Sequence, residues 1–334
     1  MLEFLKSNGR SQDRAADADS DAPATARPTI GLALGGGAAR GFAHIGVIRA
    51  LTAKGLKPDV ICGTSIGAVV GGALATDRLD VLEAWARSLC KRRVLGYLDV
   101  SLAGSGLITG ARLAARLDEA LGDTTIENLP VRFAAIATEI GTGHEIWLTR
   151  GRLADALRAS YTLPGIFAPT RVGGRWLVDG ALVNPVPVAA ARALGARLVI
   201  AVNLNAELFG RGTTISSHGS DESDALRNAL GQRRGLRRML ASERDVKRQV
   251  LGAPGSPGLL TVMSEAFNIM QDRITRARLA GDPPEVLLRP SLPDFSWMDF
   301  HRASDAIAAG VACAAMARAA IEYACRALLR SRNA

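Results

Sequence analysis

The chain has 334 residues, of which 48% are apolar, enough to fill the core of one large α/β domain or two small ones. Only 4% of the residues are aromatic whereas glycine and alanine are abundant, which favours helices packed closely on a sheet over a β-sandwich. The formal charge of +9 favours contact with anionic surfaces without identifying one. No segment reaches the roughly 20 apolar residues that a membrane-spanning helix needs.

The N-terminal residues 1–28 mix serine, aspartate, alanine, arginine and proline without a hydrophobic period, so we expect a disordered tail. The first basic residues are not followed by a continuous apolar run, which argues against a secretory signal. The four cysteines form no C-x-x-C pair and have the apolar surroundings of reduced packing residues. We therefore expect a cytoplasmic protein, and peripheral contact with the inner face of an anionic membrane stays open.

Ordered structure is expected to begin at Thr29. Residues 29–34 are apolar and predict a buried strand, which runs into a glycine loop at 35–41. Residues 42–54 have apolar residues at helical spacing and stop at Gly55. Together with the strand that follows, these segments form a βαβ unit. Its right-handed crossover places the loops after both strands at the carboxyl edge of a parallel sheet.

A short apolar run at 59–62 ends abruptly in Gly63-Thr64-Ser65-Ile66-Gly67, and small apolar residues follow from 66 to 75. We interpret this stretch as a strand, a sharp turn that contains Ser65, and a helix. Such a turn presents its central side chain outward, and Gly63 and Gly67 let neighbouring backbone pass without a Cβ clash. The helix directs its unpaired N–H groups at the place where negative charge would develop. This geometry suits a nucleophilic serine; the alternative is a glycine-rich turn with an ordinary serine.

Three successive glycines, Gly35, Gly36 and Gly37, can form a concave nest of backbone N–H groups that binds an anion. No reading frame of the loop fits the G-x-G-x-x-G dinucleotide fingerprint, and no Gly-Lys-Ser/Thr follows, so the P-loop pattern fails as well. We interpret the loop as an oxyanion hole opposite Ser65, with N–H donors from the glycines and with Arg40 orienting the loop or adding positive charge. The alternative for Arg40 is a solvated residue at a helix N-terminus.

The chain continues to alternate helices and strands as far as Asn203, and a few further elements are expected from residue 260 onward. Helical spacing of apolar residues predicts helices at 80–91, 111–121, 153–160, 188–194, 260–279 and 305–329, the last with a break at Gly310 as one option. Apolar runs predict strands at 131–138, 144–149, 175–178, 198–202 and 285–289, the second of which pairs with the first as a hairpin near the sheet edge. The alternation predicts a three-layer α/β/α fold with a mainly parallel central sheet.

The strand at 175–178 ends in Asp179-Gly180-Ala181. A carboxylate at a strand end, freed by a glycine, is in a catalytic position if that strand end lies beside Ser65. The alternative is a turn residue whose side chain accepts a hydrogen bond from a nearby backbone N–H group, which is the commoner role of an Asp-Gly pair.

Residues 206–260 interrupt the alternation and are expected to form a variable, partly mobile insertion. Within it, residues 233–250 combine many arginines with apolar residues at helical spacing. A basic amphipathic helix of this kind can lie on an anionic membrane surface. The alternative is an ordinary helix whose charged side is solvated.

Three motifs occur in order, each at a predicted strand end: Gly35-Gly36-Gly37-x-x-Arg40-Gly41, Gly63-Thr64-Ser65-Ile66-Gly67 and Asp179-Gly180-Ala181. Together they resemble the patatin-like phospholipase family, and the loop at 159–164 resembles one of its later blocks. The resemblance covers roughly residues 29–205. The stretch at 295–310 is similar to the ending of compact bacterial members, which are related to the esterase domain of neuropathy target esterase. The resemblance implies one hydrolase domain at 29–334 with the patatin-like fold.

By that resemblance Ser65 is the nucleophile and Asp179 the general base of a dyad without histidine, in a hydrolase of phospholipids, lysophospholipids or simple acyl esters. A carboxylate has a reference pKa of about 4 and is a poor base near neutral pH. Asp179 must therefore lie within hydrogen-bond reach of Ser65 Oγ in a partly desolvated pocket, where burial raises its proton affinity. Neither a metal nor a cofactor is implied, and we expect no nucleic-acid partner.

The rival mechanism is a Ser-His-Asp triad, in which the histidine follows the acid in the chain order of α/β-hydrolases. Only His218 and His301 follow Asp179, and neither comes after a glycine-marked strand end. His144 falls in the expected hairpin. His44 could line the site, although a place on the surface of a helix is the simpler expectation.

Two other functions stay open at this level. A membrane-associated binding or regulatory module would use the basic helix at 233–250 as its working part. An acyltransferase would use the same dyad and pass the acyl group to an acceptor other than water. The sequence leaves the head group, the acyl length and the oligomeric state undetermined.

Overall fold

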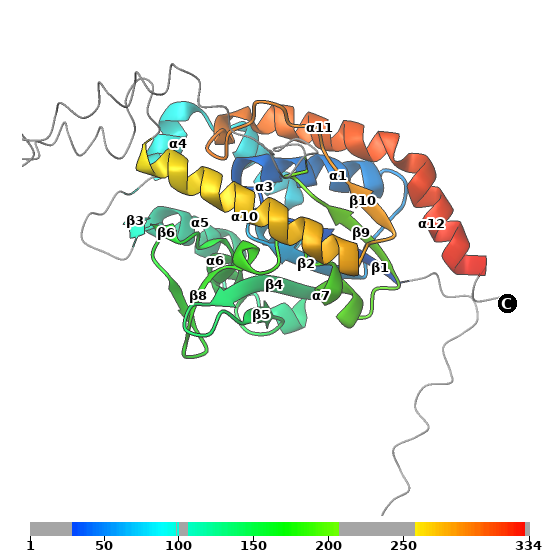
Figure 1. Cartoon of the computed structure of the whole chain (residues 1–334), viewed down its shortest axis with the longest axis horizontal. Helices are drawn as coiled ribbons and strands as arrows, with labels where there is room; N and C mark the ends of the chain where they lie inside the picture. The colour runs from blue at the N-terminus through cyan, green and yellow to red at the C-terminus, as the bar shows by residue number, and fades with distance from the viewer. Residues whose placement is uncertain (1–28, 98, 100–105, 207–257, 331–334) are drawn as a thin grey trace, which may run out of the picture.

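The computed structural model describes residues 29–97, 99, 106–206 and 258–330 (Figure 1). The strands are β1 (Ile30–Leu34), β2 (Val60–Thr64), β3 (Gly106–Ile108), β4 (Arg132–Glu139), β5 (Glu145–Leu148), β6 (Gly165–Phe167), β7 (Thr170–Val172), β8 (Arg175–Asp179), β9 (Leu198–Val202) and β10 (Val286–Leu288). The helices are α1 (Ala43–Thr52), α2 (Ile66–Ala75), α3 (Leu79–Arg87), α4 (Lys91–Tyr97), α5 (Ala111–Leu121), α6 (Leu153–Tyr161), α7 (Val188–Ala193), α10 (Leu259–Gly281), α11 (Ala303–Met316) and α12 (Arg318–Arg330). Short 3₁₀ helices are Ala38–Phe42, Ile126–Asn128, Gly180–Leu182 and Phe300–Arg302.

The predicted strands at 29–34, 131–138 and 198–202 are confirmed as β1, β4 and β9. The helix predicted at 80–91 is divided, because the chain leaves helical geometry after Arg87 and resumes it as α4. The tail at 1–28 and most of the insertion at 206–260, including the basic segment 233–250, lie outside the described residues. What we expected of these segments therefore stays a prediction.

A mostly parallel sheet divides the domain into three layers (Figure 1). The strands β10, β9, β1, β2 and β4 lie side by side in that order, and each runs parallel to its neighbour. Strand β4 also pairs antiparallel with β5 and with β8, and β7 runs antiparallel to β8. The predicted three-layer α/β/α fold with a mainly parallel sheet is confirmed.

The core lies on both faces of this sheet, because side chains along each strand alternate between the faces. On β1, Leu32 and Leu34 belong to the larger apolar cluster, which lies beneath α1, α2, α6 and α11. Ala33 belongs to the smaller cluster on the other face, beneath α7. Small residues dominate that second face, so α7 packs close to the sheet.

Two strands meet end to end beside β4. Along one side β4 pairs with β5, and along its other side it pairs with β2 as far as Thr64, opposite Ile136. The next residue of β4, Ala137, lies opposite Asp179, which ends the antiparallel strand β8. The strands β2 and β8 therefore approach each other head-on along the same side of β4. We predicted Asp179 at a strand end, but the antiparallel direction of that strand was not predicted.

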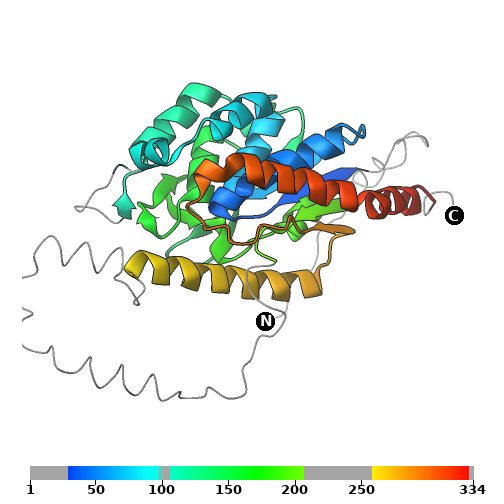
Figure 2. The same cartoon turned by 90° about the horizontal axis from the view of Figure 1, so that it is seen from above.

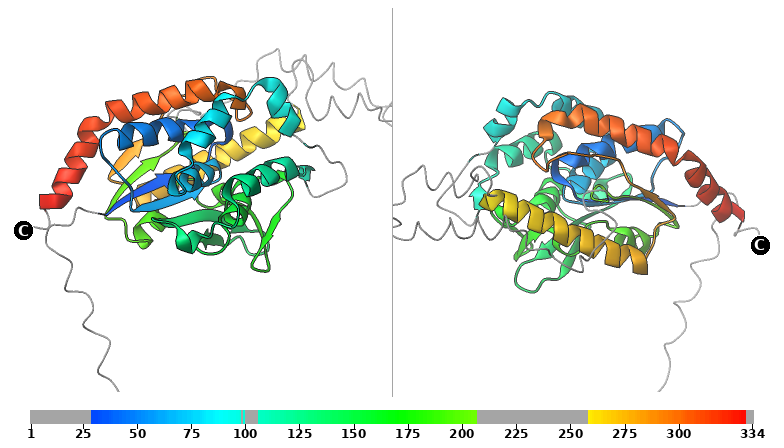
Figure 3. Two further views of the ribbon diagram at one scale, coloured as in Figure 1. Left: turned by 180° about the vertical axis from the view of Figure 1, so that it is seen from behind. Right: turned by 45° about the horizontal axis from the view of Figure 1, so that its top comes forward.

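The helices α1 and α11 cross at close range (Figure 3). The break at Gly310 that was one option for residues 305–329 does not occur, because α11 runs through this residue and the chain bends at Ala317 instead. Gly310 permits the close approach, since a Cβ at this position would collide with the carbonyl oxygen of Ala43 in α1. Gly46 of α1 meets the backbone of α11 in the same way.

Within the described part of the chain, no single helix has the length and hydropathy of a membrane span. The segments Phe300–Met316 and Arg318–Leu328 meet both criteria only as a pair, and a bend of 53° separates them. One side of α11, which includes Ile307, Gly310 and Ala314, is buried, and the helix packs on α1.

We expect Gly310→Val to lower the melting temperature, because the added side chain must push α11 away from α1. Overpacking of this kind costs about 1–3 kcal/mol and occasionally more. Differential scanning calorimetry measures the shift. Gly96→Ala in α4 is the control, since a Cβ at Gly96 meets no atom within 4 Å. An unchanged melting temperature for Gly310→Val would show that the two helices do not pack as described.

Candidate active site

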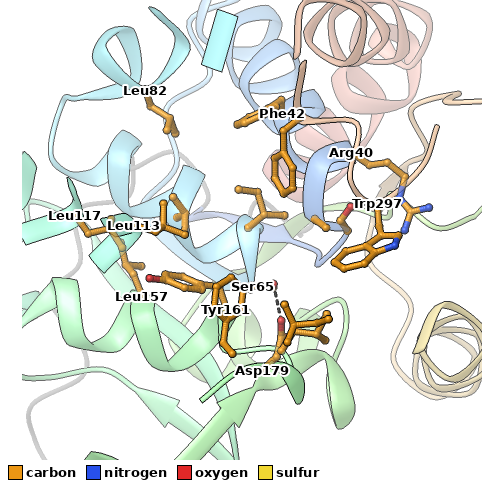
Figure 4. Close-up of a pocket in the computed structure, with 18 of the residues that line it drawn as sticks. Arg40, Phe42, Ser65, Leu82, Leu113, Leu117, Leu157, Tyr161, Asp179 and Trp297 are labelled. Carbon is orange, nitrogen blue, oxygen red and sulfur yellow. Dashed lines mark hydrogen bonds between the residues drawn. The ribbon is translucent and has the colours of Figure 1, made fainter. Parts of the chain in front are cut away.

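Ser65 occupies the turn between β2 and α2 in a backbone conformation that is rare for a residue with a side chain (Figure 4). Its φ is 56° and its ψ is −126°, a strained region that is often found at functional sites. A Cβ at Gly63 would collide with the backbone of Ala68, and a Cβ at Gly67 would collide with the carbonyl oxygen of Leu34. The two glycines therefore permit the sharp turn, for the reason expected from the sequence.

A hydroxyl group from α6 fixes this turn, and its role was not predicted. The N–H of Ser65 donates to Ser160 Oγ at 2.9 Å, and Ser160 Oγ donates to the carbonyl oxygen of Ile136 in β4 at 2.6 Å. One residue earlier, Thr64 Oγ1 donates to the carbonyl oxygen of Asn184 at 2.8 Å. The available signal was a serine on the apolar side of a predicted helix, because a buried hydroxyl must find a partner.

Asp179 is only 2% exposed, and both oxygens of its carboxylate accept hydrogen bonds. Ser65 Oγ donates to Oδ2 at 2.6 Å, and the N–H of Ala181 donates to Oδ1 at 2.8 Å. The backbone is held as well, since the N–H of Asp179 donates to the carbonyl oxygen of Thr162 at 2.8 Å and its own carbonyl accepts from Thr138 Oγ1 at 3.0 Å. The two alternatives for Asp179 thus coexist, because one oxygen closes an Asx turn and the other reaches the serine.

Burial raises the pKa of the Asp179 carboxyl to about 7, because the charged form loses its hydration inside the domain. The hydrogen bonds from Ser65 and Ala181 favour the charged form and oppose this shift. The outcome is a carboxylate whose proton affinity matches neutral pH, whereas an ordinary aspartate with a pKa of about 4 would be a weak base.

The glycine loop lies beside Ser65, but two of the expected N–H donors are engaged elsewhere. The N–H groups of Gly35 and Gly36 donate to backbone carbonyl oxygens of neighbouring segments at 3.1 and 3.0 Å, so this part of the oxyanion assignment is corrected. Among the described residues, no acceptor faces the N–H groups of Gly37 and Ala38, which both line the cavity described below. Ala38 has a φ of 49°, which marks the tight curvature of the loop at this point.

Arg40 is buried, so the alternative of a solvated residue is wrong. Its Nε donates to the carbonyl oxygen of Gly37 at 3.3 Å, and its Nη2 donates to Asn268 Oδ1 in α10 at 2.9 Å. Burial lowers the pKa of the guanidinium to about 10, against the attraction of Glu265, and leaves it charged at neutral pH. Of the two roles considered for Arg40, the contacts fit the one in which it orients the loop.

No hydrogen bond joins a described histidine to the serine or the aspartate, so the described residues give a triad no support. His44 is fully buried in α1 and not on the helix surface, and its Nε2 donates to the carbonyl oxygen of Gly35 at 2.7 Å. Burial lowers the pKa of His44 to about 4. His144 is exposed, His301 lies in a 3₁₀ turn, and His218 is outside the described residues. In the described part of the chain, no three His, Cys, Asp or Glu side chains are placed to hold a metal ion.

A cavity of about 430 Å³ lies beside Ser65 and Asp179 (Figure 4), within the range of roughly 300–1,000 Å³ that ligand pockets occupy. One wall is α2, which contributes Ile66, Val69 and Ala73 from a single side of the helix. Apolar side chains from α3, α5 and α6 form the facing walls: Leu82, Trp85, Leu113, Leu117, Leu157 and Tyr161. The cavity therefore extends from the serine along α2 between apolar walls.

Two segments from the C-terminal third complete the cavity, and neither was predicted to do so. The loop before α11 contributes Trp297, Met298 and Phe300, and α10 contributes Ser264, Phe267, Asn268 and Gln271. The N–H of Ala39 donates to the carbonyl oxygen of Trp297 at 3.1 Å, which ties this loop to the glycine loop. Part of the stretch at 295–310, which resembles the C-terminal end of compact family members, thus belongs to the site.

Comparison with known proteins adds independent findings. The profile of a family described as patatin-like phospholipase matches residues 32–192, a range that includes Ser65 and Asp179. An uncharacterised NTE family protein of Mycobacterium tuberculosis is 35% identical over 333 residues, which cover 88% of this chain and 92% of that protein. The similarity to this relative therefore spans nearly the whole of both chains.

Other relatives are similar over shorter ranges. A patatin-like phospholipase domain-containing protein of Caenorhabditis elegans is 36% identical over 200 residues, which cover 56% of this chain and 15% of that protein. The lysophospholipase nte1 of Emericella nidulans is 33% identical over 180 residues, which cover 52% of this chain and 12% of that protein. Among solved structures, VipD from Legionella pneumophila is similar with a TM-score of 0.40 and 12% identity, over 87% of this chain and 66% of that chain.

We expect Asp179→Asn to stabilise the folded protein at neutral and higher pH. An unfolded aspartate has a pKa of about 3.9, and the folded-state pKa is about 7, so the folded state resists ionisation. Ionisation of Asp179 therefore destabilises the folded wild-type protein. This destabilisation is absent below about pH 4, grows up to about pH 7 and then stays constant at as much as about 4 kcal/mol. Melting temperatures of both proteins from pH 5 to pH 8 measure it. A difference between the two that does not change with pH would disprove the raised pKa.

Proposed function

Since this chain belongs to the patatin-like phospholipase family, we propose that it is a serine acyl hydrolase, which cleaves carboxylic ester bonds of phospholipids, lysophospholipids or related lipid esters. The observation that supports the proposal most strongly is the 2.6 Å hydrogen bond from Ser65 Oγ to Asp179 Oδ2 beside an apolar cavity. Family membership supports a lipid hydrolase in general. The dyad and the bond that it cleaves are our proposal.

In the first half of the reaction, Ser65 Oγ attacks the carbonyl carbon of the ester while its proton passes to Asp179 Oδ2. The carbonyl oxygen becomes an oxyanion, for which the N–H groups of Gly37 and Ala38 are the donors and the N-terminus of α2 supplies further positive potential. When the intermediate collapses, the C–O bond to the alcohol breaks and the departing alcohol takes the proton from Asp179. The acyl group is then esterified to Ser65.

In the second half, water attacks the acyl group while Asp179 accepts one of its protons. The second tetrahedral intermediate uses the same N–H donors. When it collapses, the bond to Ser65 Oγ breaks, the proton returns from Asp179 to the serine, and the fatty acid leaves. A base with a pKa near 7 can both accept and return this proton at neutral pH.

The acyl chain lies along α2 in this proposal. Ile66, Val69 and Ala73 follow Ser65 on the same side of the helix and line the cavity. At a rise of 1.5 Å per residue, Ala73 is about 12 Å beyond Ser65 along the helix axis. The cavity therefore accepts an extended hydrocarbon chain whose carbonyl end is at the serine.

The two other functions that the sequence left open, an acyltransferase and a regulatory module, remain predictions. Transfer of the acyl group to an alcohol or thiol would use the same residues, so it stays a prediction that product analysis can test. The regulatory module based on residues 233–250 also stays a prediction, since that segment lies outside the described residues.

We expect Ser65→Ala and Asp179→Asn each to remove most hydrolysis of a short acyl ester from a folded protein. Loss of the nucleophile lowers kcat/KM by about 10³-fold or more, and loss of the general base lowers it by about 10²- to 10⁴-fold. Only the charged carboxylate accepts the proton, so wild-type kcat/KM rises up to about pH 7 and is level above it. A spectrophotometric ester assay between pH 5 and pH 9 measures both effects.

The exposed Ser304→Ala in α11 is the matched control for these variants and should keep full activity. Retained hydrolysis in either Ser65→Ala or Asp179→Asn, with the fold intact by circular dichroism, would refute the dyad.

We expect Val69→Phe and Ala73→Phe to shorten the acyl chains that the protein accepts. Phenylalanine at position 69 fills the cavity near Ser65, so hexanoyl and longer esters should lose kcat/KM by at least about tenfold while the acetyl ester is spared. Phenylalanine at position 73 should affect only dodecanoyl and longer esters, because it fills the cavity farther along α2. A series of p-nitrophenyl esters measures the profile. Equal losses for every chain length in both variants would argue against an acyl chain along α2.

A further inference from the structure

The long helix α10 has the reverse of the usual polarity of a surface helix. Buried polar side chains form its inner side: Ser264, Asn268, Gln271, Asp272 and Thr275. On the outer side, 50% of Val262, 46% of Ile269 and 36% of Met270 are exposed. An amphipathic surface helix normally turns such apolar residues toward the core. Figure 2 shows described elements of the domain on only one side of α10.

Buried hydrogen bonds hold the helix in this orientation. Arg40 Nη2 donates to Asn268 Oδ1 at 2.9 Å, and Asn205 Nδ2 donates to Gln271 Oε1 at 2.9 Å. A rotation of α10 that buried Ile269 would leave these polar groups without partners, which is unfavourable inside a protein. The exposed apolar side chains are therefore kept outside by specific contacts on the inner side.

Guanidinium groups lie among the exposed apolar side chains. Arg273 follows Val262, Ala266 and Ile269 at intervals of four, three and four residues, so these side chains share one side of the helix. Arg276 lies about one turn further along the helix and is exposed as well. Apolar side chains together with cations suit a helix that lies at the boundary between the hydrocarbon and the phosphate groups of an anionic bilayer.

The inner side of the same helix forms part of the cavity wall, through Ser264, Phe267, Asn268 and Gln271. A surface bound to the outer side of α10 is therefore separated from the cavity by little more than one helix diameter, about 10 Å. This position matters for a substrate that is itself a component of a lipid surface.

We propose that the outer face of α10 binds the surface of an anionic phospholipid bilayer. This outer face consists of Val262, Ala266, Ile269, Met270, Arg273 and Arg276. Binding there holds the cavity next to lipid molecules, and only this consequence rests on the proposed function. The binding itself is independent of catalysis.

Two other occupants of the outer face fit less well. In a two-fold contact with a second copy of the chain, the same face of both copies would meet and bring arginines of like charge together. The chain's own residues 233–250 are rich in arginine, so their charge also repels that of α10. An anionic lipid surface matches both the apolar and the cationic side chains.

The test is sedimentation with vesicles in a Ser65→Ala background, so that hydrolysis cannot alter the lipids. Vesicles of phosphatidylcholine alone are compared with vesicles that also contain phosphatidylglycerol. Ile269→Asp is the main variant, and Arg273→Gln tests the cationic contribution. Arg276 is left unchanged because it bonds to the buried Asp272. Val311→Asp in α11 is the matched control, since Val311 is 41% exposed on a different part of the surface.

We expect the parent protein to bind the anionic vesicles and Ile269→Asp to lower the bound fraction at least tenfold, with no loss in Val311→Asp. Arg273→Gln should weaken binding to anionic vesicles and reduce its dependence on salt. With Ser65 restored, Ile269→Asp should keep wild-type hydrolysis of a water-soluble ester. That result separates a loss of vesicle binding from a loss of the proposed catalysis.

Several outcomes would overturn the proposal. They are the absence of vesicle binding by the parent protein, equal binding to neutral and anionic vesicles, and a loss in Val311→Asp that matches the loss in Ile269→Asp. A lower melting temperature of Ile269→Asp without a change in vesicle binding would show that the chain covers this face itself. Dissociation of a dimer by the same variant would assign the face to a second copy.

Discussion

Ser65 and Asp179 meet because β2 and β8 approach each other head-on along the same side of β4. Thr64 is the last residue of β2 and lies opposite Ile136, while Asp179 ends β8 opposite the next residue of β4. The chain must then leave the sheet at once in both places. At Ser65 it turns into α2, and after Asp179 it turns into a 3₁₀ helix. One side of β4 thus sets the distance between the serine and the carboxylate.

This arrangement imposes costs that the surrounding residues offset. The strained φ of Ser65 is tolerated because Ser160 accepts a hydrogen bond from its N–H and because glycines flank the turn. The buried carboxyl of Asp179 is held by hydrogen bonds but disfavours ionisation, so the group that the reaction needs also lowers stability at neutral pH. Arg40 joins the glycine loop to α10, so the loop and the outer helix are held by one guanidinium. The site and the proposed lipid-binding face are therefore parts of one hydrogen-bonded unit.

Local signals predicted the elements around Ser65, because an apolar run, two glycines and a small-residue helix concern neighbours in the chain. The contact between Ser65 and Asp179 could be predicted only from the family resemblance, since 114 residues separate them in the sequence. In addition, the residues of a strand do not indicate whether it runs parallel or antiparallel to its neighbours. His44 was expected at a helix surface, and a solvated position was the alternative for Arg40, but both are buried because α10 and α11 from the C-terminal third cover them. Ser160 was missed because its partners, Ser65 and Ile136, lie 95 and 24 residues away in the sequence. Each error concerns a partner that is distant in the sequence.

Activation of Ser65 by Asp179 is tested most directly by labelling the protein with a fluorophosphonate and mapping the modified peptide. The reagent forms a stable covalent bond with a serine whose hydroxyl proton is removed by a neighbouring base. We predict an adduct on Ser65, at a rate that rises with pH up to about pH 7 and is lost in Asp179→Asn. An adduct on another residue, or labelling of Ser65 at the wild-type rate in Asp179→Asn, would contradict the dyad.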